Sequence, residues 1–212
     1  SARLVELMNP LSAEWQYMRP NLAFGLLEVV ARHAGLGQNR GGFFDAGAVF
    51  EKLNENVPAE GAKATPGEGA RTSGTRESWH AAWTLMGNRQ SDHWSTDKKS
   101  ADRKAPVDFF DGKGVAQNLI SGLSALDGRW SALSFLALDE ALAKPEVKAA
   151  LDNECAWIPS GLLHPGRSAL LVLPGRPPGE IVGYVGELHP AHKRDLLNLP
   201  AGLNLGVVLG EI

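Results

Sequence analysis

Residues in the C-terminal part of the chain carry the side chains best suited to metal or acid–base chemistry. His189 and His192 are spaced i,i+3 and can share one face of a helix, while His164 and Glu187 can lie near them across a sheet. Imidazole and carboxylate groups are zinc ligands and also general acids and bases. However, His189 precedes Pro190, which biases it away from helical geometry, and neither HExxH nor another complete ligand set is present. The sequence therefore predicts no metal site. A free-standing enzyme that uses His164, Glu187 and His189 stays an alternative.

Two glycine-containing stretches match nucleotide-binding motifs only in part. A phosphate-binding loop of the GxxxxGK[ST] type needs a glycine where Val107 stands, and it needs Ser or Thr where Gly114 follows Lys113. Gly35-Leu-Gly37 begins like a dinucleotide fingerprint, but it ends a predicted helix instead of opening one. No GxSxG elbow marks a serine nucleophile. These patterns give no catalytic residue.

The first half of the chain alternates between strand-like and helical patterns. Residues 3–8 predict a short strand that the turn pair Asn9-Pro10 closes, and Pro20 can serve as the first residue of a helix. That helix has apolar residues at helical spacing and ends at two glycines: Leu22, Leu26, Val30 and Ala34, then Gly35 and Gly37. Two strands follow, one at Phe43–Phe50 and one whose shared face carries Trp79, Ala81, Trp83 and Leu85. We predict that Trp79 and Trp83 lie in the core.

The second half of the chain returns from helical to strand-like patterns. A helical pattern ends the segment Val107–Leu123, and weaker helical patterning over residues 131–152 is broken at Pro145. Three strands and a short helix are predicted after it: Arg167–Leu173, Ile181–Leu188, Asn204–Leu209 and the helix Ala191–Leu197. Strands in blocks, without a regular β-α-β alternation, predict an α+β fold with a mostly antiparallel sheet flanked by helices.

One domain is predicted over residues 1–212, with mobile loops near 54–77 and 92–104 and a helical insertion near 122–155. The first loop has scarcely any large apolar residue, so it cannot bury enough surface to offset the entropy of ordering it. The second loop is a run of charged residues.

Composition limits the class of protein. The 212 residues are 43% hydrophobic without an apolar run of membrane length, so no membrane association is predicted. With 21 basic and 24 acidic residues the net charge is −3, which argues against a domain that mainly grips phosphate backbones. The lone Cys155 is predicted to be a buried, inert thiol in a reducing, cytoplasmic compartment. Because the chain begins at Ser1-Ala2 without an initiating Met, we expect it to be a piece of a longer protein.

Four segments in order carry a more specific signal. They are Asn9-Pro10-Leu11-Ser12 leading to Met18-Arg19 and a Leu-rich helix, then Phe43–Phe50, then Val107–Gly114, and finally His164–Ala169 followed by Gly183–Pro190. In that order they closely resemble the patterns NPLSxE…LR…LLPGLL, LFEIGxVF, VDFFDxKG, HPGRSA and GxLGELHP of the bacterial phenylalanyl-tRNA synthetase beta subunit family. The departures are small: Pro20 replaces Thr or Ser, Asp45-Ala46 replaces Glu-Ile, and Gly112 replaces Leu.

The resemblance implies a fold like that of class II aminoacyl-tRNA synthetases. In this family the beta subunit core is similar to a degenerate copy of the catalytic module, and the alpha subunit performs the chemistry. The chain would scaffold the alpha subunit in an alpha2-beta2 heterotetramer that charges tRNA(Phe) with phenylalanine. ATP and magnesium would serve the whole ligase, with none bound by this segment. In agreement, the GxGxxxR motif of class II enzymes is incomplete here, because Asn118 stands where the arginine should follow Gly112-Lys113-Gly114.

The resemblance also suggests roles for single residues. Arg19 and Arg167 would contact the partner subunit or RNA; alternatively, Arg167 would pair locally with Glu187 or Asp111. Asp108 and Asp111 suit a helix N-terminus, where their carboxylates would satisfy free N–H groups. The remaining motif residues are expected to be structural: Asn9, Pro10, Asp45, Gly47, Phe110, Lys113, His164, Glu187 and His189. No catalytic residue is expected, and an RNA-binding module stays a further alternative.

Overall fold

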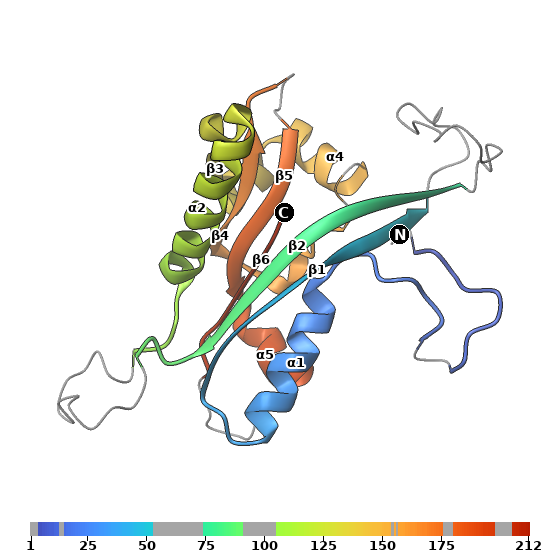
Figure 1. Ribbon diagram of the computed structural model, residues 1–212, viewed down its shortest axis with the longest axis vertical. Helices are drawn as coiled ribbons and strands as arrows, with labels where there is room; N and C mark the ends of the chain where they lie inside the picture. The colour runs from blue at the N-terminus through green and yellow to red at the C-terminus, as the bar shows by residue number, and fades with distance from the viewer. Residues whose placement is uncertain are drawn as a thin grey trace.

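An antiparallel sheet organises the chain. The computed structural model describes residues 4–12, 15–52, 74–90, 105–153, 155, 157–175, 180–197 and 205–212. In these residues the sheet has six strands: β1 (Arg40–Lys52), β2 (Thr75–Gly87), β3 (Ser134–Ala137), β4 (Leu163–Leu173), β5 (Glu180–Leu188) and β6 (Val207–Glu211). They lie in the order β1-β2-β6-β5-β4-β3, and every neighbouring pair is antiparallel (Figure 1). The predicted α+β class with a mostly antiparallel sheet is confirmed.

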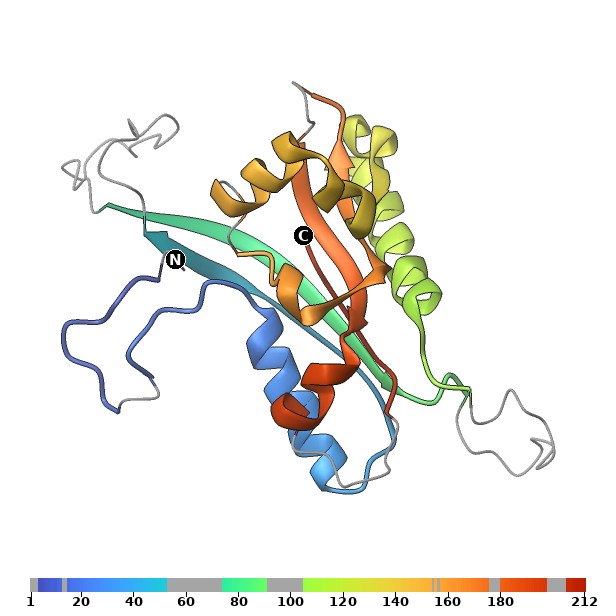
Figure 2. The ribbon, with the colours of Figure 1, turned by 180° about the vertical axis from the view of Figure 1, so that it is seen from behind.

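Helices cover both faces of this sheet. On one face α2 (Phe109–Leu126) packs against β5 and β6 (Figure 1). The other face carries α1 (Ala23–Gly35), α3 (Leu138–Ala143), α4 (Pro145–Asn153) and α5 (Pro190–Leu197), which stand in front of the sheet in Figure 2. Two 3-10 turns complete the described elements: η3 (Gly128–Ala132) and η4 (Ser160–Leu162).

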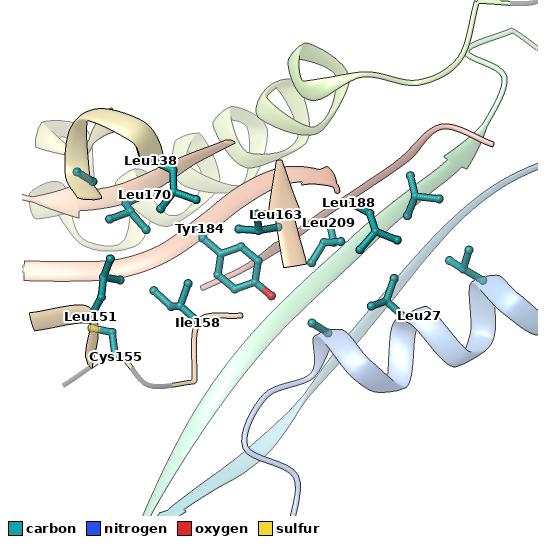
Figure 3. Close-up of a cluster of buried hydrophobic side chains, with 14 of the residues drawn as sticks. Leu27, Leu138, Leu151, Cys155, Ile158, Leu163, Leu170, Tyr184, Leu188 and Leu209 are labelled. Carbon is teal, nitrogen blue, oxygen red and sulfur yellow. The ribbon is translucent and has the colours of Figure 1, made fainter. Parts of the chain in front are cut away.

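Alternation along the strands divides the core between the two faces. Leu170 and Tyr184 belong to the larger cluster, shown in Figure 3, whereas Leu171 and Val185 pack under α2. Trp83 joins the cluster under α2 and is 6% exposed, as predicted. Its neighbour on the same strand face, Trp79, is 77% exposed. The prediction that Trp79 lies in the core is therefore wrong, because α2 covers this face of the sheet only as far as Trp83, and α1 packs on the opposite face of the ribbon.

The helix predicted from Pro20 begins slightly later, at Ala23. The amide Oδ1 of Asn21 accepts a hydrogen bond from the backbone N–H of Phe24 at 3.4 Å. At the other end Gly37 has φ +78°. The N–H of Gly37 donates to the carbonyl of Ala34, and the N–H of Gln38 donates to the carbonyl of His33. These two bonds satisfy carbonyls of the last turn, so Gly37 ends the helix as predicted.

Other expectations need correction. Within residues 4–8 the structure has no strand, only an isolated bridge between Glu6 and Tyr17. The loop predicted over 54–77 is described only from Gly74, and Thr75–Glu77 already belong to β2; residues 92–104 lie outside the described part. The stretch 122–155 contains helices but also the edge strand β3, which pairs with β4. A short apolar run cannot be assigned to strand or helix from its pattern alone.

Two predictions about environment can be compared with the fold. Cys155 is buried in the larger core cluster, as predicted. No helix in the described part of the chain is both long and apolar enough to cross a membrane.

Candidate functional site

Glu187 joins three of the five motif patterns, from the third and fourth segments, at the start of α2. This side chain on β5 is 7% exposed; its Oε1 accepts a hydrogen bond from the backbone N–H of Phe109 at 3.1 Å, and its Oε2 lies 3.1 Å from Nη1 of Arg167. Phe109 belongs to the VDFFDGKG segment, Arg167 to HPGRSA and Glu187 to GELHP. The carboxylate satisfies one of the free N–H groups of the first helical turn. One side chain therefore holds together segments that lie far apart in the sequence.

The N-terminus of α2 carries a complete capping box. Asp108 Oδ1 accepts from the backbone N–H groups of Phe110 and Asp111, and the Asp111 side chain accepts from the N–H of Asp108. Both carboxylates also bind Arg89, whose Nη2 lies 2.7 Å from Asp108 Oδ2 and whose Nε lies 3.0 Å from Asp111. The hydrogen bond and charge of Asp111, together with Asp108, raise the pKa of Arg89. The prediction that both aspartates cap this helix is confirmed. Arg89, which binds both carboxylates, was not predicted from the sequence.

Close packing of α2 on the sheet depends on Gly112. A Cβ at this position would overlap the side chain of Val208 on β6 and would lie 3.2 Å from Cγ2 of Val185 on β5. One residue later, Lys113 Nζ lies 4.9 Å from the centre of the Phe135 ring, at cation–π distance. The two motif residues thus fix how the helix contacts the sheet.

Arg167 pairs with Glu187, which is one of the two local partners that the sequence offered. The other, Asp111, is held by Arg89. Lys193 on α5 belongs to the same group, because the charges of Glu187 and Arg167 both act on it. Partial burial lowers the pKa of Lys193, Glu187 acts against that shift and Arg167 adds to it. The result is a small charged cluster in which the one carboxylate already has partners.

A second group of motif residues lies on β1. Arg19 donates from Nε to the carbonyl of Ala48 at 2.8 Å, and its Nη1 lies 3.3 Å from Asp45 Oδ2. Gly47 stands between these partners, and a Cβ there would overlap the guanidinium of Arg19. The first two motif segments therefore meet through Arg19, which the sequence could not show.

Three histidines form a row where β4, β5 and α5 meet. The ring centres of His164 and His189 are 5.8 Å apart, and those of His189 and His192 are 5.7 Å apart. His189 Nδ1 accepts a hydrogen bond from the backbone N–H of Ala191, and in the described structure the buried Nδ1 of His164 has no partner. The described residues contain no group of three His, Cys, Asp or Glu side chains able to hold a metal ion. The predicted proximity of His164 and His189 is present, while Glu187 is engaged by Phe109 and Arg167.

A buried carboxylate network escaped the sequence analysis. Glu211 on β6 is 0% exposed; its Oε1 accepts from the backbone N–H of Leu22 at 3.1 Å and lies 2.8 Å from His80 Nδ1. Tyr184 donates to Oε2 at 3.3 Å. Burial, followed by the charge of Glu211, raises the pKa of Tyr184, which keeps it a neutral donor. The only signal in the sequence was a carboxylate that ends an apolar strand.

The remaining motif residues lie outside these contacts. Asn9 and Pro10 are exposed in the N-terminal segment, and Phe110 is exposed beside Phe109, with ring centres 5.5 Å apart. Asn118, at the place of the class II arginine, is exposed on α2.

Comparison with known proteins agrees with the motifs. The family model described as "Phenylalanyl tRNA synthetase beta chain CLM domain" matches residues 1–202. Three similar proteins are each named phenylalanine--tRNA ligase beta subunit. The one from Mannheimia succiniciproducens is 32% identical over 87% of this chain and 17% of its own length. The protein from Photorhabdus laumondii is 33% identical over 90% of this chain and 18% of its own length. The protein from Vibrio parahaemolyticus is 30% identical over 97% of this chain and 20% of its own length. The chain thus spans about a fifth of these relatives.

Proposed function

We propose, because this chain belongs to the phenylalanyl-tRNA synthetase beta chain family, that it is a non-catalytic domain with a class II synthetase-like core. Its role is to scaffold the alpha subunit in an alpha2-beta2 heterotetramer of the cytoplasm. That ligase uses ATP to charge tRNA(Phe) with phenylalanine, and the tRNA is bound by the enzyme as a whole. Residues 1–212 act as one domain in this assembly.

The engagement of Glu187 is the observation that best supports a scaffold. A general base needs a carboxylate that can reach a substrate proton. Both oxygens of Glu187 instead hold the protein together, one at the start of α2 and one at Arg167. Asp108 and Asp111 are likewise occupied by the helix N-terminus and by Arg89. The motif acids thus do structural work.

The residues that the structure describes do not fit ATP or magnesium. Gly112 and Gly114 lie inside α2, and Gly112 faces Val208, so neither can form an open loop around a phosphate. The described residues hold no cluster of carboxylates suited to a cation. ATP and magnesium therefore belong, in this proposal, to other parts of the ligase.

Arg19 and Arg167 are the proposed contacts to the alpha subunit. Each side chain is about half exposed while one side of it is held in place, Arg19 by Ala48 and Asp45 and Arg167 by Glu187. A pre-positioned guanidinium loses little entropy when it binds a second carboxylate. The same geometry also suits an RNA phosphate, and measuring the binding of alpha subunit and of tRNA separately distinguishes these two partners.

The test is to titrate the purified chain with alpha subunit and follow complex formation by size-exclusion chromatography with light scattering. We expect a complex that the double substitution Arg19→Ala and Arg167→Ala weakens. Lys148→Ala, which removes an exposed positive charge on α4 that takes part in neither ion pair, serves as the control. No complex under any condition would overturn the scaffold. Tight, steeply salt-dependent binding of tRNA by the chain alone would instead favour an RNA-binding module.

A further inference from the structure

One face of the β1–β2 ribbon carries two large apolar side chains, Phe44 and Trp79, that no other described element covers. Residues directly opposite each other in the register share a face, so Phe44 lies beside Trp83 and Ala48 beside Trp79. Trp83 packs in the cluster under α2, whereas Phe44 is 85% and Trp79 77% exposed. In Figure 1 α2 lies over the other strands, and no described helix stands in front of the ribbon.

This face contains no charged or hydroxyl side chain over most of the ribbon. From Gly42 to Ala48 and from Trp79 to Leu85 its positions are Gly42, Phe44, Ala46, Ala48, Trp79, Ala81, Trp83 and Leu85. The opposite face of the same ribbon includes Asp45, His80 and Thr84. A sheet face that stays in water normally alternates polar residues outward, so an exposed face of this composition marks a contact surface.

The outer edge of β1 is open beside this face. Backbone groups of alternate residues point to the same side of an antiparallel strand. The N–H of Phe50 donates to the carbonyl of Arg19, and the carbonyl of Ala48 accepts from its side chain, so even-numbered residues of β1 point outward. Phe44 and Ala46 therefore also present their backbone groups outward, where no described residue bonds to them. The apolar face and the open edge form one continuous surface, which we name the ribbon surface.

We infer that the ribbon surface is covered, in the complete beta subunit, by apolar side chains from a part of the same polypeptide outside these 212 residues. This rests on the family membership and not on binding of the alpha subunit. The relatives are long enough to supply such a segment, because the matched region is only 17% to 20% of their length. A sheet with an apolar face buries it against a further layer of structure. Around Phe44 this face carries only apolar residues, and charge returns at Glu77, beyond Trp79; an apolar centre of this kind fits permanent packing better than a transient contact.

Side-chain reactivity tests the inference directly. Hydroxyl-radical footprinting would compare Trp79 oxidation in three samples: this chain, the complete beta subunit, and that subunit with alpha subunit. Trp15, which is 70% exposed, and the buried Trp83 are internal references. We expect Trp79 to react like Trp15 in this chain and to fall to the level of Trp83 in the complete subunit alone. Unchanged reactivity there would overturn the inference. So would protection that needs alpha subunit, or protection in this chain that grows with its concentration, since these point to a different occupant.

Paired variants give a second measurement. Phe44→Ser with Trp79→Ser should leave the thermal midpoint of this chain nearly unchanged, because both side chains are in solvent. The same pair should lower the midpoint of the complete beta subunit. Equal shifts in the two proteins would contradict the inference even if the alpha complex still forms, which keeps it distinct from the scaffold proposal.

Discussion

Gly47 leaves the space that the guanidinium of Arg19 occupies on β1, so that Arg19 reaches both the carbonyl of Ala48 and the carboxylate of Asp45. The Arg19–Asp45 ion pair is exposed and contributes about 0–1 kcal/mol. The missing Cβ at Gly47 leaves room for this ion pair and for the hydrogen bond to Ala48, while the backbone bond from Phe50 to Arg19 holds the N-terminal segment beside β1. A motif glycine and a motif arginine are thus explained by one contact.

Replacing Gly47 with Ala should displace Arg19. We expect Gly47→Ala to cost at most about 1 kcal/mol of unfolding free energy, because the added Cβ overlaps the end of a flexible, half-exposed side chain that can move away from Asp45 and Ala48. Urea unfolding measures the change. In a double-mutant cycle, Arg19→Ala should remove most of the cost of Gly47→Ala. Strict additivity of the two substitutions would contradict the contact.

Glu187 should be important for stability. Glu187→Ala leaves the N–H of Phe109 unpaired at a partly buried position, which we expect to cost about 1–2 kcal/mol. Glu187→Gln keeps a side-chain acceptor for that N–H and should cost less. Chemical denaturation of both variants, with hydrogen exchange at the start of α2, provides the measurement. An Ala variant as stable as the parent chain would show that this contact is not needed.

The two glycines of the GKG segment should respond in opposite directions. Gly112→Ala places a Cβ against Val208 and should destabilise the fold by about 1–3 kcal/mol. Gly114→Ala has no atom within 4 Å of the new Cβ and should stabilise α2 by about 0.5–1 kcal/mol. Because both sites are in one helix, the pair is its own control. Thermal unfolding that places both variants on the same side of the parent would refute the packing argument.

Tyr184 should make stability fall at alkaline pH. Burial and the charge of Glu211 raise its pKa in the folded chain, while an unfolded tyrosine ionises near about pH 10. The contribution is therefore fully present below about pH 10 and is lost as pH rises toward the folded pKa. Tyr184→Phe lacks this ionisation but loses a hydrogen bond of about 1 kcal/mol at neutral pH. Urea unfolding from about pH 8 to pH 11 should show that the free energies of unfolding of the parent and the variant approach each other as the pH rises. A difference in unfolding free energy that stays constant over this range would argue against the raised pKa of Tyr184.

The sequence predicts the elements of this fold better than their contacts. Periodicity locates α1 and the strands β1, β4 and β5, because apolar spacing is a local property. It fails for Trp79, since the same alternation places Trp79 and Trp83 on one face and only the position of α2 decides which is covered. It fails for β3 because that strand, Ser134–Ala137, is only four residues long and lies between segments with helical patterns.

In the candidate site, too, the sequence predicts local features but not the contacts between distant residues. The four motifs identify the family, and the spacing of Asp108 and Asp111 indicates a helix cap. Partners that are distant in the chain are invisible in one sequence: Glu211 bonds to Leu22, 189 residues away, and Arg89 bonds to aspartates 19 and 22 residues away. Such pairs depend on how the strands are ordered in the sheet, which local pattern does not determine.

We propose that this chain supports the ligase without performing its chemistry. The sharpest test of that proposal is the phenylalanine-dependent exchange of pyrophosphate into ATP. The measurement compares this chain alone, the alpha subunit alone, and the alpha subunit with complete beta subunit. The account predicts exchange in the assembled enzyme and none by this chain at any concentration. Exchange by this chain alone that is abolished by Glu187→Gln or His164→Ala, with the fold intact by circular dichroism, would contradict it.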